Sequence, residues 1–383
     1  MIVLKQARLP IKIWAEESDL VGYEEAIAQA VNLANHPLAQ KWVALMPDFH
    51  IGYGMPVGGV LATQGGVIPN AVGVDIGCGM LAAETNLKKD QLPKDLLQQL
   101  RQLIHAKVPV GMKHHKHPQH HPYLKTTSKD PIISTQLKAA DTQIGTLGGG
   151  NHFIEIQADE EGKVWIMIHS GSRNLGKRVA DYYHRKAIDY TVNDKGLPDR
   201  DLAYLSDKVP QYQMYLEAMN FCLKFAEHNR ENMLKAIKSA FAEVGKPLSV
   251  KQQFDNHHNF AALETHYGQK LLIHRKGAIK AEGLVIVPGS MGTASYIGEG
   301  LRPSESFNTC AHGAGRTLGR RQANRTISHA QAVSAMRHVV FNVRHGDYDE
   351  MPMAYKNIDR IIKLQADLVK PVHKLHPLAV VKG

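Results

Sequence analysis

Four short segments of this chain place a histidine, a cysteine or a carboxylate beside glycine, and they lie far apart. They are residues 75–79, 150–155, 169–173 and 311–316. Because these candidate ligands run from residue 75 to residue 312, a site built from them must assemble across most of the chain. This favours one domain over residues 1–383 rather than two independent ones. The segments resemble a metal site beside a phosphate site, a pairing that suggests metal-assisted phosphoryl or nucleotidyl transfer.

The composition fits a folded enzyme with an anionic partner. Hydrophobic residues make up 43% and charged residues 21%, so a core can form. The net charge of +10 favours nucleic acid as a partner, although a merely basic enzyme fits equally well. Three cysteines are too few for a disulfide scaffold. We find no signal peptide and no run of 18 apolar residues, so we expect a cytoplasmic protein without a membrane span.

The apolar pattern predicts both helices and strands. Residues 41–80 look like short strands and turns, with frequent glycines. An apolar run at 164–168 predicts a strand that delivers His169 at its end, and 284–287 predicts a strand stopped by Pro288. Helical spacing predicts three helices: one with Leu96, Leu97, Leu100, Leu103 and Ile104, a long one over 211–243, and one with Ile358, Ile361, Ile362, Leu368 and Val369.

Each candidate metal ligand is weak evidence for a metal site on its own. Asp75 and Cys78 can converge on one centre because Gly77 permits a tight turn, but a buried structural cysteine beside a turn-forming aspartate fits as well. A thiolate can bridge two metals. His152 follows three glycines whose backbone amides can surround an anion; the alternative is a core histidine after a glycine turn. His169, at a strand end, is also well placed for a metal.

Two questions about the metal stay open at this level. His257 and His258 are adjacent and usually point apart in one element, so only one is expected to ligate, and spacing does not choose between them. Cysteine with histidine and one carboxylate suggests zinc on ligand softness, while manganese and iron remain possible.

His312 is the sharpest single residue. The small residues Gly313, Ala314 and Gly315 leave space for a bulky ligand beside its ring, and Arg316 could neutralise a transferring phosphate. A histidine can be the nucleophile and form a phosphoramidate; the alternatives are a further metal ligand or a capping residue. The glycines at 145–150 lack the spacing of a dinucleotide fingerprint, and no Walker loop is present.

A histidine-rich tract at 112–121 accounts for part of the 22 histidines. Its lysines and prolines indicate an exposed loop. It could bind a metal as a side site, or meet phosphate as a solvated loop.

Taken together, the motifs resemble one family, the RtcB-type RNA ligases. The segments that carry the resemblance are MPDFH (46–50), VGVDIGCGM (72–80), GTLGGGNHFIE (145–155), HSGSR (169–173), PGSMG (288–292), HGAGR (312–316), PMAYK (352–356) and VKG (381–383). They occur in the family's order from about residue 40 onward. One departure is Tyr53, where some members carry a basic residue, which bears on RNA preference rather than on chemistry.

The resemblance implies a reaction. The family joins an RNA 2′,3′-cyclic phosphate or 3′-phosphate end to a 5′-hydroxyl end, using GTP and two manganese ions. His312 would attack the α-phosphate of GTP to give a histidine–GMP intermediate, GMP would pass to the RNA 3′-phosphate, and the 5′-hydroxyl would displace it. The implied fold is α+β, with packed β-sheets flanked by helices around a central dinuclear metal cleft.

The resemblance also implies residue roles. The metal ligands would be Asp75, Cys78 as a bridge, His152, His169 and His258. The guanylate contacts would come from Asn151, His152, Phe153, Ile154, Glu155, His258, Pro288, Gly289, Ser290, Met291, Ser295, His312, Gly313, Ala314, Gly315, Tyr355 and Lys382. Arg173, Arg316 and Arg320 would meet RNA phosphates.

Two other functions compete with this one: a dinuclear phosphodiesterase that opens cyclic phosphates without ligating, and a non-catalytic RNA-binding protein. The intact segment around His312 argues against the second, because binding alone needs no nucleophile. We expect a monomer that works on tRNA splicing, RNA repair or both. An activating protein partner, the physiological RNA and the role of the histidine tract are left open by the sequence.

Overall fold

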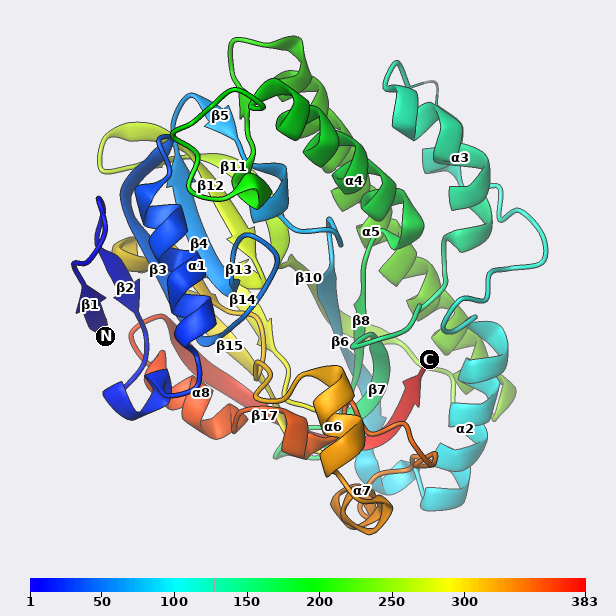
Figure 1. Cartoon of the computed structure of the whole chain (residues 1–383). Helices are drawn as coiled ribbons and strands as arrows, with labels where there is room; N and C mark the ends of the chain where they lie inside the picture. Colours follow the sequence, from blue (N-terminus) through cyan, green and yellow to red (C-terminus); the bar gives the residue numbers. More distant parts are fainter. Residues whose placement is uncertain (127) are drawn as a thin grey trace.

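The computed structural model describes residues 1–126 and 128–383 and is built on two larger β-sheets (Figure 1). The six-stranded sheet has the order β1-β2-β3-β4-β12-β11, and only β2 and β3 pair in parallel. Its strands are β1 (Ile2–Leu4), β2 (Ile11–Ile13), β3 (Ala39–His50), β4 (Val57–Thr63), β11 (Asn259–His266) and β12 (Gln269–Lys276).

The seven-stranded sheet is antiparallel throughout, with the order β10-β6-β8-β7-β17-β15-β14. Its strands are β6 (Gly79–Lys88), β7 (Phe153–Ala158), β8 (Lys163–Ser170), β10 (Val250–His257), β14 (Glu282–Val287), β15 (Ser295–Leu301) and β17 (Val369–Lys382). Two small sheets pair β5 (Gly66–Val67) with β9 (Leu205–Ser206), and β13 (Ala278–Lys280) with β16 (Thr309–Ala311).

Helices cover both sheets. Figure 1 shows α3, α4 and α5 side by side, and α1 across the six-stranded sheet. Apolar residues of α2 and α5 form one core with β6, β7 and β8, while α1 packs on β3 and β4. The helices are α1 (Glu24–Asn35), α2 (Lys94–Lys107), α3 (Pro131–Gln143), α4 (Arg173–Tyr190), α5 (Pro210–Glu243), α6 (Arg320–Thr326), α7 (His329–Met336) and α8 (Ile358–Leu364).

Most predicted elements are confirmed. The strand predicted at 164–168 lies within β8, the strand at 284–287 lies within β14, and the long helix at 211–243 is α5. The predicted apolar stripe of α5 is buried along its length. The mixture of sheets and helices agrees with the coarse fold expectation. None of the helices in the described ranges is both long and apolar enough to cross a membrane.

Two predictions about elements were wrong in detail. The helix predicted from Ile358 to Val369 ends at Leu364, and Val369 starts β17 instead. Leu368 and Val369 pack into the same core as the apolar residues of α8, so helical spacing continued by chance across the boundary. The strands at 41–80 are not all short, because β3 has 12 residues.

The chain passes from one large sheet to the other at His258. β10 belongs to the seven-stranded sheet and β11 to the six-stranded one, and His258 alone separates them. Its backbone amide donates a hydrogen bond to the Cys78 carbonyl (2.9 Å), and its carbonyl accepts one from Ala278 (3.0 Å). This junction therefore brings residues of both sheets to the same place.

Candidate metal and nucleotide site

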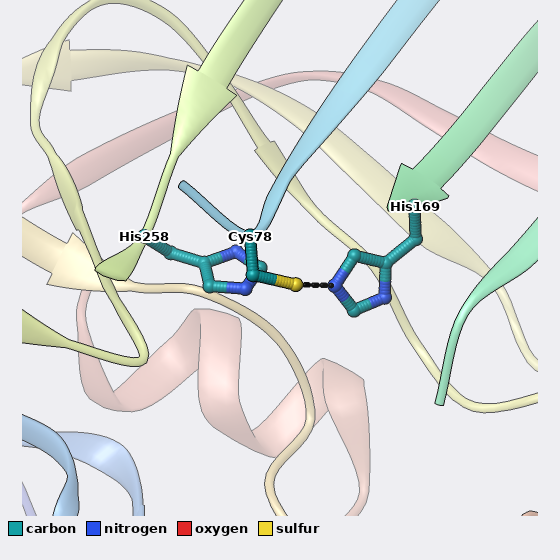
Figure 2. A group of neighbouring side chains, drawn as sticks. All are labelled: Cys78, His169 and His258. Carbon is teal, nitrogen blue, oxygen red and sulfur yellow. Dashed lines mark hydrogen bonds between the residues drawn. The ribbon is translucent and has the colours of Figure 1, made fainter. Parts of the chain in front are cut away.

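Cys78 lies at the centre of a buried group of metal-ligand side chains. Its Sγ is 3.3 Å from His152 Nε2 and 3.3 Å from His169 Nε2. Figure 2 shows the Cys78 sulfur between the rings of His169 and His258. Two sets of potential ligand atoms share this sulfur, one with His169 and His258 and one with Asp75 and His152. A shared thiolate is the arrangement that can bridge two metal ions.

Backbone carbonyls fix which ring nitrogen points into this group. His152 Nδ1 is 3.0 Å from the Leu147 carbonyl, and His169 Nδ1 is 3.1 Å from the Asn151 carbonyl. Because a carbonyl only accepts, each Nδ1 carries the proton and each Nε2 presents its lone pair toward Cys78. A ligating histidine held this way by its far nitrogen is the usual arrangement in metal sites.

The atoms that converge beside Cys78 would interact more favourably with a bound cation than they do with one another. His152 Nε2 lies 3.2 Å from Asp75 Oδ2, so a lone pair faces a carboxylate oxygen. His258 Nδ1 is buried without a hydrogen-bond partner among the described residues. A cation bound between His152 Nε2 and Asp75 Oδ2 would satisfy both of these atoms. A second proton on His152 would do so only by adding a charge to a buried ring.

The electrostatics of the group point the same way. Burial and nearby imidazoles lower the pKa of His169 and His258 well below the ordinary value, so both rings are neutral and offer lone pairs. Desolvation and Asp75 raise the pKa of the Cys78 thiol well above its ordinary value, so a thiolate here needs a bound cation. Desolvation is the largest influence on Asp75 and opposes its ionisation, but the neighbouring His152 ring and the positive charge of Arg173 outweigh it, so the pKa of Asp75 is lowered.

The structure separates the two adjacent histidines that spacing could not. His258 belongs to the Cys78 group. His257 turns away, with Nε2 3.1 Å from Glu227 Oε1 and Nδ1 3.3 Å from the Gly77 carbonyl. Neighbouring residues at the end of an extended strand face opposite sides, which is why only one reaches the group.

Two polar residues of α5 hold the turns that carry the ligands. Arg230 is fully buried, and its Nη1 donates to the carbonyls of Ser170 (2.7 Å) and Gly77 (3.2 Å). Asn229 accepts hydrogen bonds from the amides of Gly145 and Thr146 and donates to the Gly171 carbonyl. Sequence reasoning missed both, because α5 was read only by its apolar stripe. A buried Asn-Arg pair inside such a stripe was the available signal.

His312 lies against the metal group but has a different partner. Its Nδ1 is 2.6 Å from Asp48 Oδ2, and the same oxygen accepts the backbone amides of His312 (3.0 Å) and Gly313 (3.2 Å). Its ring centroid is 4.8 Å from that of His258. With Nδ1–H donated to a carboxylate, Nε2 keeps its lone pair and is a candidate nucleophile.

Asp48 is fully buried, and glycine is required beside it. A Cβ on Gly315, which has φ +72°, would lie 2.2 Å from the Asp48 carbonyl oxygen. A Cβ on Gly58, with φ +80°, would lie 2.9 Å from Asp48 Oδ1. Asp48 belongs to the MPDFH segment but had no predicted role; its place near the end of the apolar strand β3 was the available signal.

A cavity of about 410 Å³ opens beside His312 and the Cys78 group. Of the predicted nucleotide contacts, these residues line it: Asn151, Phe153, His258, Pro288, Gly289, Ser290, Met291, His312, Gly313, Ala314, Tyr355 and Lys382, with Gly315 at its wall. Arg316 and Arg320 line it as well. The structure thus gathers most of the predicted residues around one space.

Four predicted contacts do not line that space: His152 belongs to the group around Cys78, and Ile154, Glu155 and Ser295 lie behind the cavity. Ile154 packs into the core of the seven-stranded sheet, so its side chain faces away. Glu155 and Ser295 are joined through Gln157, whose Nε2 donates to Glu155 Oε2 (2.5 Å) and Ser295 Oγ (3.2 Å). Burial raises the pKa of Glu155 to about 8, with Lys382 opposing this, so the carboxyl is mostly protonated at neutral pH.

The three predicted phosphate-binding arginines differ in how many hydrogen bonds and ion pairs they already form within the protein. Arg316 already donates to the carbonyls of Leu318 and Asp349 and to Glu350 and Tyr355. Arg320 is paired with Asp349 (2.6 Å) and Glu350 (2.7 Å). Arg173 has a weaker set of partners: its Nε donates to Thr146 Oγ1 at 3.2 Å, and its Nη1 lies 3.4 Å from His152 Nδ1, which does not accept because it donates to the Leu147 carbonyl. Arg173 thus has the fewest accepting partners of the three.

Lys276 is a buried cation at this cavity that sequence reasoning did not single out. Its Nζ donates to the carbonyls of Tyr53 (2.6 Å) and Asn70 (3.2 Å), and burial lowers its pKa to about 7. It ties the turn around Tyr53 to the cavity wall. The histidine-rich tract contributes to neither potential metal group in the described residues.

Comparison with known proteins identifies close relatives. The family model described as tRNA-splicing ligase RtcB matches residues 29–129 and 114–383. The chain is 36% identical to the RNA-splicing ligase RtcB of Escherichia coli strain K12, over 100% of this chain and 99% of that protein. It is 32% identical to the tRNA-splicing ligase RtcB of Nanoarchaeum equitans, over 98% and 95%. It is 33% identical to the RNA-splicing ligase RtcB of Mycobacterium tuberculosis, over 93% and 100%.

Proposed function

Because this chain belongs to the RtcB family, we propose that it is an RNA ligase that consumes GTP and requires manganese. It would join 2′,3′-cyclic phosphate or 3′-phosphate ends to 5′-hydroxyl ends, in tRNA splicing, RNA repair or both. The observation that carries the proposal is the placement of His312. Its Nδ1 is bound by a buried carboxylate, and its ring lies beside a group of metal-grade ligands.

We propose that Asp75, Cys78, His152, His169 and His258 hold two manganese ions, with Cys78 shared. The two ligand sets that meet at the Cys78 sulfur support this count. The ions, when bound, would neutralise charge on phosphate oxygens and activate water. Manganese rather than zinc is taken from the family resemblance, since ligand type alone favours zinc.

In the first step, His312 Nε2 would attack the α-phosphorus of GTP. The new N–P bond forms as the bond to the bridging oxygen of pyrophosphate breaks, and pyrophosphate leaves with that electron pair. The imidazole becomes cationic, and the Asp48 carboxylate, 2.6 Å from Nδ1, offsets that charge. Stabilising a cation that exists only along the reaction lowers the barrier rather than the ground state.

The second and third steps move GMP onto RNA and off again. An oxygen of the RNA 3′-phosphate attacks the GMP phosphorus, and the N–P electron pair returns to His312. The 5′-hydroxyl then attacks the RNA phosphorus and loses its proton, while GMP leaves. A cyclic end would first add water to become a 3′-phosphate. Arg173, with the fewest protein partners of the three candidate arginines, is the best placed to meet an RNA phosphate.

The cavity beside His312 would hold the guanylate. Glu155 and Ser295, which lie behind that cavity, are proposed to accept from the donors of guanine through their carboxyl and hydroxyl oxygens, and Lys382, which lines it, would donate to an acceptor of the guanylate. Lys382 Nζ reaches the carbonyls of Gly150 (2.5 Å) and His152 (3.4 Å), which ties the end of β17 to the glycine loop. One domain over residues 1–383, a monomeric state and a cytoplasmic location stay predictions, as does an activating protein partner.

The test is covalent labelling with GTP. Purified protein is incubated with manganese and α-labelled GTP and run on a denaturing gel, beside His312→Ala and the matched variant His117→Ala, which changes an exposed histidine. We expect an acid-labile band in the wild type and in His117→Ala, and none in His312→Ala. Absence of the band in a wild type that binds manganese and opens cyclic phosphates would replace the ligase by a phosphodiesterase.

A further inference from the structure

A second cavity, of about 340 Å³, lies next to the proposed nucleotide cavity and has no assigned role. The two share Met291, Glu350 and Lys382 in their walls. Its remaining lining comes from α2, from the segment after α7 and from the last residue: Arg101, Gln102, His105, Phe341, Asn342, Arg344, Asp347 and Gly383.

Among the described residues, the two arginines of this cavity have no close carboxylate partner, whereas its lysine, Lys382, lies 3.8 Å from Glu350. Arg101 and His105 are one helical turn apart on α2, and Arg344 faces them from the other wall. Within the described part of the chain, neither arginine forms an ion pair with a carboxylate or a side-chain hydrogen bond. Arg316 and Arg320 next door, by contrast, are both paired with Glu350.

The cations act on one another across the space. Partial burial and the charge of Arg344 lower the pKa of Arg101. Partial burial, followed by Lys113, Arg101 and Arg344, lowers the pKa of His105. Asp347 lies among these cations but forms no ion pair within the described residues, so their mutual repulsion still costs free energy, and an anionic ligand would reduce that cost.

Backbone hydrogen bonds hold the segments that carry Arg344 and Lys113 in place. The Val340 amide donates to the Leu378 carbonyl (2.8 Å), which fixes the start of the Arg344 segment on β17. The Gly111 amide donates to the Gly148 carbonyl (2.8 Å), which fixes the Lys113 loop on the glycine loop of the site. Of the acidic residues, Glu350 is already bound to Arg316 and Tyr355, while Asp347 remains exposed.

We propose that this cavity binds the phosphodiester backbone of single-stranded RNA next to the end being joined, through Arg101 and Arg344, with a base stacked on Phe341. Basic side chains together with an aromatic ring on which a base can stack are the combination that binds single-stranded nucleic acid without reading sequence. The shared wall would lead the strand from this cavity to the nucleotide cavity. The inference rests on the proposed function and extends it by naming a second RNA contact.

The experiment measures RNA affinity without ligation. Fluorescent single-stranded RNA with a 3′-phosphate is titrated with Arg101→Gln/Arg344→Gln at several salt concentrations, without GTP. The matched control is Arg178→Gln/Arg185→Gln, which removes two exposed arginines of α4. We expect the test variant to bind roughly tenfold more weakly than the control, with the salt slope smaller by about 1.4, at about 0.7 for each lost contact.

Two single variants separate charge from folding. Asp347→Asn should bind RNA more tightly than the wild type, because it removes a negative charge from the cavity wall. Phe341→Leu should bind more weakly with an unchanged salt slope, since stacking involves no counterion release. A folding defect in the double variant would not produce a gain in Asp347→Asn.

Guanylylation with labelled GTP separates this inference from the proposed function. We expect the double variant to label at the wild-type rate with an unchanged KM for GTP. RNA binding equal to that of the control overturns the inference, as does a raised KM for GTP, which would make the cavity part of the nucleotide site. Absence of labelling in the wild type itself would count against the proposed function, while the RNA titration still tests the cavity.

Discussion

His312 lies next to the group of side chains around Cys78, yet its Nδ1 has a different kind of partner from the Nδ1 atoms of His152 and His169. His152 and His169 each donate Nδ1–H to a backbone carbonyl. His312 donates Nδ1–H to the carboxylate of Asp48. A neutral carbonyl fixes the tautomer and leaves a neutral ligand. A carboxylate does the same and also stabilises a positive charge on the ring.

This difference assigns chemistry to two otherwise similar side chains. A metal ligand keeps its ring neutral throughout. A nucleophile that attacks phosphorus must carry a positive charge until the bond breaks, so a buried counter-charge is useful only there. The partner of the second nitrogen, rather than the type of residue, separates the proposed ligands from the proposed nucleophile.

We expect the largest effect on guanylylation from a change at Asp48, the carboxylate that binds His312. Asp48→Asn keeps the size of the side chain but removes the charge that balances the cationic ring, so guanylylation should slow by roughly 10²–10⁴-fold. Labelling with α-labelled GTP measures the rate, and manganese binding should be unchanged. The control is Asp90→Asn, an exposed position. A rate within twofold of the wild type would mean that Asp48 serves only the fold.

The next effect comes from removing a ligand of the Cys78 group. His169→Ala should weaken manganese binding by more than about 100-fold, a lower bound taken from the loss seen with outer-shell partners. His312→Ala should leave it unchanged. Manganese at about 100 times its Kd should stabilise the wild type by about 2.7 kcal/mol in thermal unfolding and should not stabilise His169→Ala. Equal losses of manganese in both variants would break the distinction between the two regions.

The smallest effect concerns Glu155, behind the nucleotide cavity. Its raised pKa of about 8 means that below pH 8 the free protein holds a proton there. Guanine donors need the ionised carboxylate, so binding below pH 8 releases that proton and is weakened. The KM for GTP should fall by up to about tenfold for each pH unit from 6.5 to 8 and then level off.

Glu155→Gln provides the contrast for the pH profile. Its KM should be flat over the same range, because no carboxyl remains to titrate. Gln157→Ala removes the donor that favours the ionised form, so it should move the wild-type inflection to higher pH. A wild-type KM that is independent of pH would exclude Glu155 as the acceptor for the base.

The pattern of apolar residues predicted a helix or strand correctly where one face of that element packs against a single core. The long apolar stripe predicted α5, and the run at 164–168 predicted β8 with His169 near its end. The pattern failed at Val369, which begins a strand but packs into the same core as α8. Periodicity reports which residues are buried, and it does not separate two elements that share one core.

The sequence by itself determined the donor types, the glycines around them and the resemblance that ordered them into one proposed site. The resemblance also selected His258 over His257, but only the tertiary structure shows that His258 reaches Cys78 while His257 turns away, that Asp48 partners His312, and that Asn229 and Arg230 hold the ligand turns. The physical reason is that these contacts join residues tens to hundreds of positions apart. Spacing along a chain limits only near neighbours, whereas the packing of two sheets fixes which distant side chains meet.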